Sequence, residues 1–245
     1  MPRLLQFESH HPRDSARLEW AVPEGSGPLD PAELVRRLGR LASGLVQRAA
    51  GAELISVDLE RLQLLGEVHA GERLVATAAL SRPTSGRWPV SVLVRKAHGR
   101  RQPVAAVGVL RFTRAGATLQ PVERPEQAAG RARVATSFHV RSSTPDVLVS
   151  GNILAWVHAS ALLCAQGQSA SELKPLGLDG VSLYASVEPN ERLELECTVL
   201  EDTASTVSVL SELKSAARLV TVGRAISRFR RVVRPASQGS SALIS

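Results

Sequence analysis

The sequence repeats itself at a spacing of about half its length. Segment 68–74 (VHAGERL) resembles segment 187–193 (VEPNERL), a shift of 119 residues (190 − 71 at the matched Gly71 and Asn190). A Val-Gly pair at 107–108 recurs at 222–223, a shift of 115 (222 − 107). Such self-similarity predicts two units of one plan. The boundary between two matched units is then a natural place for a binding site.

Each half predicts the same order of elements, namely a strand, one long helix and four further strands. In the first half, Asp30 and Pro31 begin an amphipathic helix that ends near Gly51. The strands expected in this half span 15–22, 54–65, 73–81, 90–96 and 104–114. The second half predicts a helix at 149–165 and strands at 133–140, 180–187, 193–202, 205–214 and 218–231. An antiparallel sheet wrapped around one helix is the economical fold for such a unit.

A chain of 245 residues is long enough for two domains of ordinary size. The repeat predicts an N-terminal unit at 1–118 and a C-terminal unit at 131–234. Residues 119–130 contain proline and glycine and are predicted to be a linker, and residues 235–245 are predicted to be a disordered tail.

The composition limits the kinds of partner that the chain is expected to bind. Aromatic residues make up only 3% of the chain and no dense basic run is interleaved with them, so the formal charge of +7 does not indicate nucleic-acid binding. Cys164 and Cys197 stand in apolar contexts and are predicted to be reduced and buried. The six histidines lack the spacing of metal ligands, so no metal site is expected. Without a signal peptide or an apolar run of ~18 residues, we expect a cytoplasmic protein with no membrane span.

Two features resemble the hotdog-fold acyl-CoA thioesterase family. Segments 64–74 and 183–193 pass from hydrophobic into polar residues and end in Gly-Glu-Arg-Leu and Asn-Glu-Arg-Leu, similar to the family's entry into its third strand. Segment 150–160 (SGNILAWVHAS) is similar to the family's helix entry, in which small residues precede Trp-Met-Asp or a variant and then alanines. The resemblance covers the chain from about residue 16 to about residue 233.

The resemblance implies an α+β double hotdog, in which two antiparallel sheets each wrap around a long central helix and pack as an intrachain pseudo-dimer. It implies acyl-CoA or an acyl carrier protein as the partner, with coenzyme A only as part of the substrate and no separate cofactor. It also implies that the protein associates into a homo-oligomer.

Thioester hydrolysis requires a donor for the developing oxyanion and a base that activates water. Ser150 and Gly151, at the start of the second helix, are candidates for binding the substrate and its oxyanion. Asn152 and His158 are the candidate catalytic residues, with His158 at the position where the family commonly has an acidic residue. The ordinary alternatives are that Ser and Asn cap the helix and that His158 packs in the core.

Two further groups are candidates. Asp58 and Glu60 of the first unit could supply an acid, although charges on a strand commonly face solvent. Four arginines near predicted hairpin ends could contact the phosphates of the substrate, or only keep an edge strand soluble. These are Arg82, Arg87, Arg100 and Arg101.

The sequence leaves three functions open. We favour an acyl-thioester hydrolase centred on Asn152 and His158. The first alternative is a non-catalytic acyl-thioester-binding or scaffold protein of hotdog fold, because no Asp or Glu occurs between 147 and 171. The second is a hotdog dehydratase or hydratase, whose Asp-x-x-x-x-His and His-x-x-x-Gly-x-x-x-x-Pro signatures are absent from the sequence.

Overall fold

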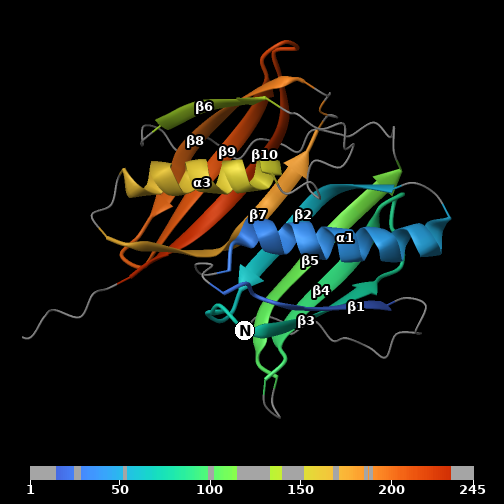
Figure 1. Ribbon diagram of the computed structural model, residues 1–245. Helices are drawn as coiled ribbons and strands as arrows, with labels where there is room; N and C mark the ends of the chain where they lie inside the picture. The colour runs from blue at the N-terminus through green and yellow to red at the C-terminus, as the bar shows by residue number, and fades with distance from the viewer. Residues whose placement is uncertain are drawn as a thin grey trace, which may run out of the picture.

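In the part of the chain that it describes, the computed structural model contains ten strands and two helices (Figure 1). The structure describes residues 15–24, 29–51, 54–98, 102–114, 133–139, 152–167, 171–184, 187 and 190–232. The first half contains β1 (Ser15–Ala21), α1 (Pro31–Ala50), β2 (Leu54–Leu64), β3 (Arg73–Leu80), β4 (Trp88–Lys96) and β5 (Val104–Arg114). The second contains β6 (Arg133–His139), α3 (Asn152–Gln166), β7 (Leu173–Leu183), β8 (Arg192–Asp202), β9 (Thr206–Ser215) and β10 (Val220–Arg231). The expected linker at 119–130 and tail at 235–245 lie outside the described residues.

All of the described strands belong to one antiparallel sheet, in the order β1-β3-β4-β5-β2-β7-β10-β9-β8-β6. The expectation of two separate sheets is therefore corrected, because β2 pairs with β7 and joins the halves. This pairing satisfies backbone N–H and C=O groups that would be exposed at the edge of each half alone. Figure 1 shows both helices on one face of this sheet, where α1 contacts α3.

The two halves use the same strand order when each is read from its outer edge to the seam. β1-β3-β4-β5-β2 corresponds to β6-β8-β9-β10-β7. Matched strands start at shifts close to that of the sequence repeat, such as 119 for β2 and β7 (173 − 54) and 119 for β3 and β8 (192 − 73). The repeat in the sequence is therefore a repeat in strand topology.

The buried faces of the two helices also match at a shift of 119 (153 − 34). The matched buried positions of α1 are Leu34, Val35, Leu38, Gly39, Ala42, Leu45 and Val46, and Pro31 and Ala32 are buried as well. Those of α3 are Ile153, Leu154, Val157, His158, Ala161, Cys164 and Ala165, and Ser160 is buried as well. The α1 helix begins with Pro31 after the N-cap Asp30, whose Oδ1 accepts a hydrogen bond from the Ala32 amide at 2.9 Å, and it ends at Gly51 in the left-handed conformation.

The repeated motif before β3 and β8 has a structural function. Gly71 and Asn190 both have positive φ, of 80° and 63°, and the following glutamate binds a cation near the end of the next hairpin. Glu72 pairs with Lys96 at 2.9 Å, and Glu191 pairs with Arg218 at 2.8 Å. The residue with positive φ therefore makes the turn, and the glutamate after it binds the neighbouring hairpin through an ion pair. This structural function explains why the motif occurs in both halves.

The seventh strand begins earlier than the sequence predicted. We expected a strand at 180–187, whereas β7 spans Leu173–Leu183 and includes Pro175. A proline within a strand argues against a central position. Here a register shift between Arg228 and Phe229 of β10 accommodates it, since Phe229 is opposite Pro175. Pairing with distant strands therefore determines where this strand begins, although its local sequence is unfavourable for a strand.

The seam between the halves is close-packed at a glycine. A Cβ atom placed on Gly177 of β7 would lie 2.2 Å from the carbonyl oxygen of Leu62 in β2. The missing side chain is therefore a condition for the β2–β7 backbone approach.

We predict that Gly177→Ala lowers the free energy of unfolding by about 3 kcal/mol, because the added methyl group must push β2 and β7 apart. Chemical denaturation measures this change. Gly44→Ala in α1 is the control, since the nearest atom to its Cβ position is 3.7 Å away on the flexible Arg48 side chain. We expect the control to gain about 0.5–1 kcal/mol from helix propensity. Equal stability of Gly177→Ala and the wild type would contradict the close approach.

We predict that Glu72 stabilises the fold in a pH-dependent way. The amide of His69, followed by Lys96, holds the pKa of the Glu72 carboxyl below its ordinary 4.5. A carboxyl with a lowered pKa contributes stability above its unfolded pKa, and this contribution is lost as the pH falls through the folded value. The difference in unfolding free energy between wild type and Glu72→Gln should therefore shrink on acidification from about pH 7 to about pH 3. A difference that stays constant over that range would refute the prediction.

Candidate functional site

His158 of α3 points into the core, where only 6% of it is exposed. Its Nδ1 lies 3.3 Å from the hydroxyl oxygen of Ser227 in β10. The imidazole ring stacks on Phe229 of the same strand, with ring centroids 5.0 Å apart and an interplanar angle of 27°. These contacts fix the orientation of the ring.

The other ring nitrogen of His158 is buried and lacks a partner. Nε2 makes no hydrogen bond to any described residue. Burial lowers the pKa of His158 from its ordinary 6.5, and the negative charge of Asp30 partly opposes this effect. The imidazole is therefore neutral near pH 7 and has one nitrogen available for a ligand, a water or a proton. A buried polar atom without a partner costs free energy that the fold alone does not explain.

The first half shows what this position looks like without the polar pair. Gly39 is the counterpart of His158, at a shift of 119 (158 − 39), and Leu110 is the counterpart of Ser227, at a shift of 117 (227 − 110). The strand register supports the second match, because Leu110 is opposite Leu59 and Ser227 is opposite Leu178. The fold therefore forms in one half with glycine and leucine at these places. The polar pair of the second half is not a requirement of the architecture.

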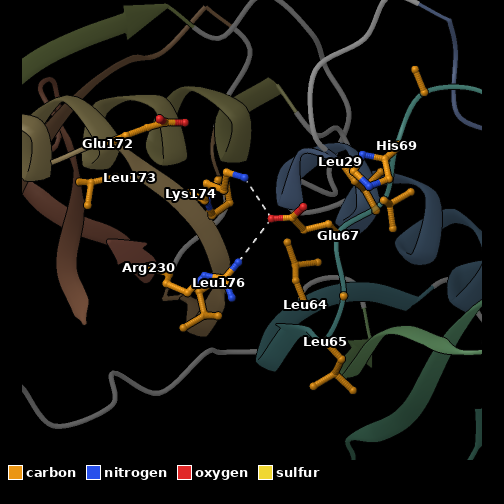
Figure 2. Close-up of a pocket in the computed structure, with 14 residues that line it drawn as sticks. Leu29, Leu64, Leu65, Glu67, His69, Glu172, Leu173, Lys174, Leu176 and Arg230 are labelled. Carbon is orange, nitrogen blue, oxygen red and sulfur yellow. Dashed lines mark hydrogen bonds and ion pairs between the residues drawn. The ribbon is translucent and has the colours of Figure 1, made fainter. Parts of the chain in front are cut away.

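A pocket of about 680 Å³ opens at one end of the seam (Figure 2). It lies between the β2–β3 connection and the start of β7. Most of its wall is apolar, formed by Leu29, Leu64, Leu65, Val68, Leu173, Pro175 and Leu176. Its polar side chains are Glu67, His69, Glu172, Lys174 and Arg230. The volume and the mostly apolar lining are typical of a small-molecule site.

The pocket is linked to His158 only through neighbours along the chain. Leu29 lines the pocket and is followed by Asp30, whose charge acts on His158. Arg230 also lines it and follows Phe229, which stacks on the imidazole. Because side chains alternate along a strand, Arg230 lies on the sheet face opposite Phe229 and His158, and His158 does not line the pocket.

An ion-pair cluster connects the two halves across this pocket. Oε1 of Glu67, in the β2–β3 connection, lies 3.0 Å from Nζ of Lys174 and 3.5 Å from a guanidinium nitrogen of Arg230. The contact with Lys174 is the main cause of a lowered pKa of the Glu67 carboxyl. Figure 2 shows the two cations converging on this one carboxylate.

The predicted helix entry is only partly described. Ser150 and Gly151 lie outside the described residues, and Asn152 is the first residue of α3, with its side chain also outside the description. Their expected contacts with a substrate therefore stay predictions.

The structure places Asp58 and Glu60 away from the helices. Asp58 precedes Leu59, which belongs to the core, and it binds Arg111 at 3.0 Å and the hydroxyl of Ser182 at 3.2 Å. Glu60 binds the same Arg111 at 2.5 Å. Side chains alternate between the two faces along a strand, and each of these three residues stands next to a buried core residue. The sheet face opposite the helices is therefore shared by Asp58, Arg111 and Ser182. The structure does not bring these carboxylates to His158.

Two of the four arginines proposed for phosphate contact can be compared with the pocket. Arg82 and Arg87 are exposed residues of the β3–β4 hairpin and do not line it. Arg100 and Arg101 lie outside the described residues.

Sequence reasoning missed Asp30 and Ser227 as members of the site. Asp30 had a sufficient explanation as a helix N-cap, a role that it does have. For Ser227 a signal was present, because a polar residue alternates there with Ala225 and Phe229 on the buried face of β10. Such a residue needs a polar partner in the core.

Two kinds of feature are absent from the described residues. Within those ranges, no three His, Cys, Asp or Glu side chains gather closely enough to hold a metal ion. Neither α1 nor α3 is both long and apolar enough to cross a membrane.

No protein-family model and no curated protein matches this sequence. Solved structures do match. The 12:0-ACP thioesterase from Umbellularia californica has a TM-score of 0.67 at 9% identity, covering 89% of this chain and 94% of that one. An acyl-ACP thioesterase from Bacteroides thetaiotaomicron has a TM-score of 0.61 at 11% identity, covering 89% and 98%. The acyl-CoA thioesterase II TesB2 from Mycobacterium marinum has a TM-score of 0.59 at 12% identity, covering 89% and 94%.

These likenesses extend over nearly the full length of each chain, and their low identities make them a statement about architecture. The strand order, the two helices on one face and the comparisons agree. The chain has a hotdog thioesterase-like fold.

Proposed function

We propose that this protein is an acyl-thioester hydrolase of double-hotdog architecture that uses His158 as its base. The observation that carries the proposal is the buried Nε2 of His158, which has no partner among the described residues. A mostly apolar pocket of about 680 Å³ lies at the seam of the same sheet. Acyl-CoA or acyl carrier protein thioesters are the proposed substrates, a choice supported by the names of the structural neighbours.

The proposed reaction uses the neutral imidazole. Nδ1 lies 3.3 Å from the Ser227 hydroxyl oxygen. In the proposed tautomer Nδ1–H donates to this oxygen, and the lone pair of Nε2 takes a proton from water as the water oxygen attacks the thioester carbonyl. The negative charge of Asp30 stabilises the imidazolium that forms. The tetrahedral oxyanion then collapses, the C–S bond breaks, and the leaving thiolate takes the proton back from Nε2. The start of α3, at Ser150, Gly151 and Asn152, is proposed to stabilise the oxyanion.

We propose a single equipped site. The counterparts of His158 and Ser227 in the first half are Gly39 and Leu110, which supply neither a base nor a group to orient one. A duplicated unit is free to keep the chemistry in one copy, provided that the other copy still completes the sheet and the pocket.

One observation favours a non-catalytic acyl-thioester-binding protein as a second candidate. His158 is almost fully buried against Phe229, and α3 contains no carboxylate. A binder would keep the pocket without turning the ligand over.

The first test is release of free thiol from acyl-CoA substrates with short to long chains. We expect turnover by the wild type, and a fall in kcat of about 10²–10⁴-fold in His158→Gln with little change in KM, because only the base is lost. The exposed His98→Gln is the control and should have wild-type activity. The double variant His158→Gly with Ser227→Leu copies the first half and should fold but lack activity.

If the wild type hydrolyses no substrate while acyl-CoA still raises its melting temperature, the binding function replaces the enzymatic one.

The second test is the pH dependence of kcat/KM. Because burial lowers the pKa of His158 from 6.5, the neutral base persists on acidification, and we expect the acid limb of the profile below pH 6.5. Asp30 raises this pKa, so Asp30→Asn should move the limb to still lower pH while asparagine keeps the helix cap. An acid limb above pH 6.5, or a shift to higher pH in Asp30→Asn, would exclude His158 as the base.

A further inference from the structure

We propose that Lys174 and Arg230 bind a phosphate group of the thiol portion of the substrate, and that Glu67 occupies their place in the absence of ligand. The inference rests on the proposed function, because it takes the ligand to be a thioester of coenzyme A or of a phosphopantetheine-bearing carrier. It assigns phosphate recognition to the seam pocket rather than to the β3–β4 hairpin.

The geometry of the cluster is that of an anion site occupied by the protein's own carboxylate. Two cations from β7 and β10 of the second half meet one oxygen of Glu67 from the first half (Figure 2). Among the residues that line the pocket, Lys174 and Arg230 are the two lysine or arginine side chains. Other cations of the seam, such as Arg111 and Arg228, bind Asp58, Glu60 and Asp179 and do not line it.

Glu67 uses these cations incompletely. Arg230 contacts it through one nitrogen at 3.5 Å, whereas a guanidinium can bind a phosphate through two parallel hydrogen bonds. A phosphate also has three acceptor oxygens and more negative charge than a carboxylate, so it can serve both cations at once. All three side chains are partly exposed, with 37%, 54% and 49% of Lys174, Arg230 and Glu67 open to solvent. An incoming anion can therefore displace the carboxylate without unfolding the pocket.

The apolar wall begins beside the ion pairs. Leu64, Leu65 and Leu176 lie next to them in Figure 2, and Leu65 is half exposed although it is a large apolar residue. A ligand with a phosphate at one end and a less polar arm at the other matches this order of surfaces. The arm would extend from the cations along the leucines of the pocket.

Binding of coenzyme A, 4′-phosphopantetheine and pantetheine, measured by calorimetry, tests the inference. We expect Lys174→Ala and Arg230→Ala each to weaken coenzyme A binding about tenfold and to leave pantetheine binding unchanged, because pantetheine has no phosphate. Glu67→Gln should strengthen coenzyme A binding severalfold, because the competing charge is removed. Higher salt should weaken coenzyme A binding in the wild type and have little effect in the double variant Lys174→Ala with Arg230→Ala.

The matched control is Lys214→Ala. Lys214 forms an ion pair with Glu196 at 2.9 Å and is 38% exposed, closely like Lys174, but it lies outside the seam pocket. It should leave the binding of all three probes unchanged.

The three probes also locate the phosphate. Equal losses for 4′-phosphopantetheine and coenzyme A in the variants assign the site to the 4′-phosphate, which carrier proteins share. A loss confined to coenzyme A assigns it to the phosphates of the nucleotide portion. If the affinity ratio of coenzyme A to pantetheine is the same in the wild type and in Lys174→Ala with Arg230→Ala, the inference is overturned.

Calorimetry needs no turnover, so this test is separate from that of the hydrolase. Normal hydrolysis together with an unchanged ratio of coenzyme A to pantetheine affinity would contradict only the phosphate site. Phosphate-dependent binding without hydrolysis would contradict only the catalytic proposal.

Discussion

Hydrogen bonds between β2 and β7 hold the two halves of this protein in one sheet. The pairing removes two sheet edges and sets the position of each helix relative to the opposite half. It depends on backbone approach at Gly177, where no side chain fits. On the face away from the helices each half has a matching ion pair, since Glu60 with Arg111 corresponds to Asp179 with Arg228. Asp179 of β7 also lies 3.4 Å from Arg61 of β2, so an ion pair joins the same two strands as the backbone.

The joint makes a shared site out of two similar units. Asp30 begins α1 in the first half, yet its charge acts on His158 in the second. The pocket takes Glu67 from one half and Lys174 and Arg230 from the other. Neither half alone contains the cluster. A duplicated chain can thus hold the scaffold constant while the residues at the seam diverge, as Gly39 and His158 do at matched buried positions.

Much of the fold could be predicted from local patterns. The α1 helix follows from an Asp-Pro start, an apolar stripe and a glycine end, and most strands follow from alternation between turns. The start of β7 could not be predicted, because Pro175 and Gly177 are poor strand residues whose places are fixed by partners in β10 and β2. Local patterns also could not predict that the two expected sheets form one sheet. The alternation of residues along a strand does not indicate which other strand it pairs with.

For the site, the sequence by itself determined that two matched units exist and that His158 stands at an unusual place on an uncharged helix. Only the tertiary structure decided that Ser227 contacts this histidine, that Asp30 acts on it from the other half, and that Asp58 and Glu60 face away. The physical reason is that spacing along the chain fixes which face of its own element a residue occupies. Which faces then meet is set by hydrogen-bond register and packing between segments far apart in the sequence, and those terms belong to the folded chain as a whole.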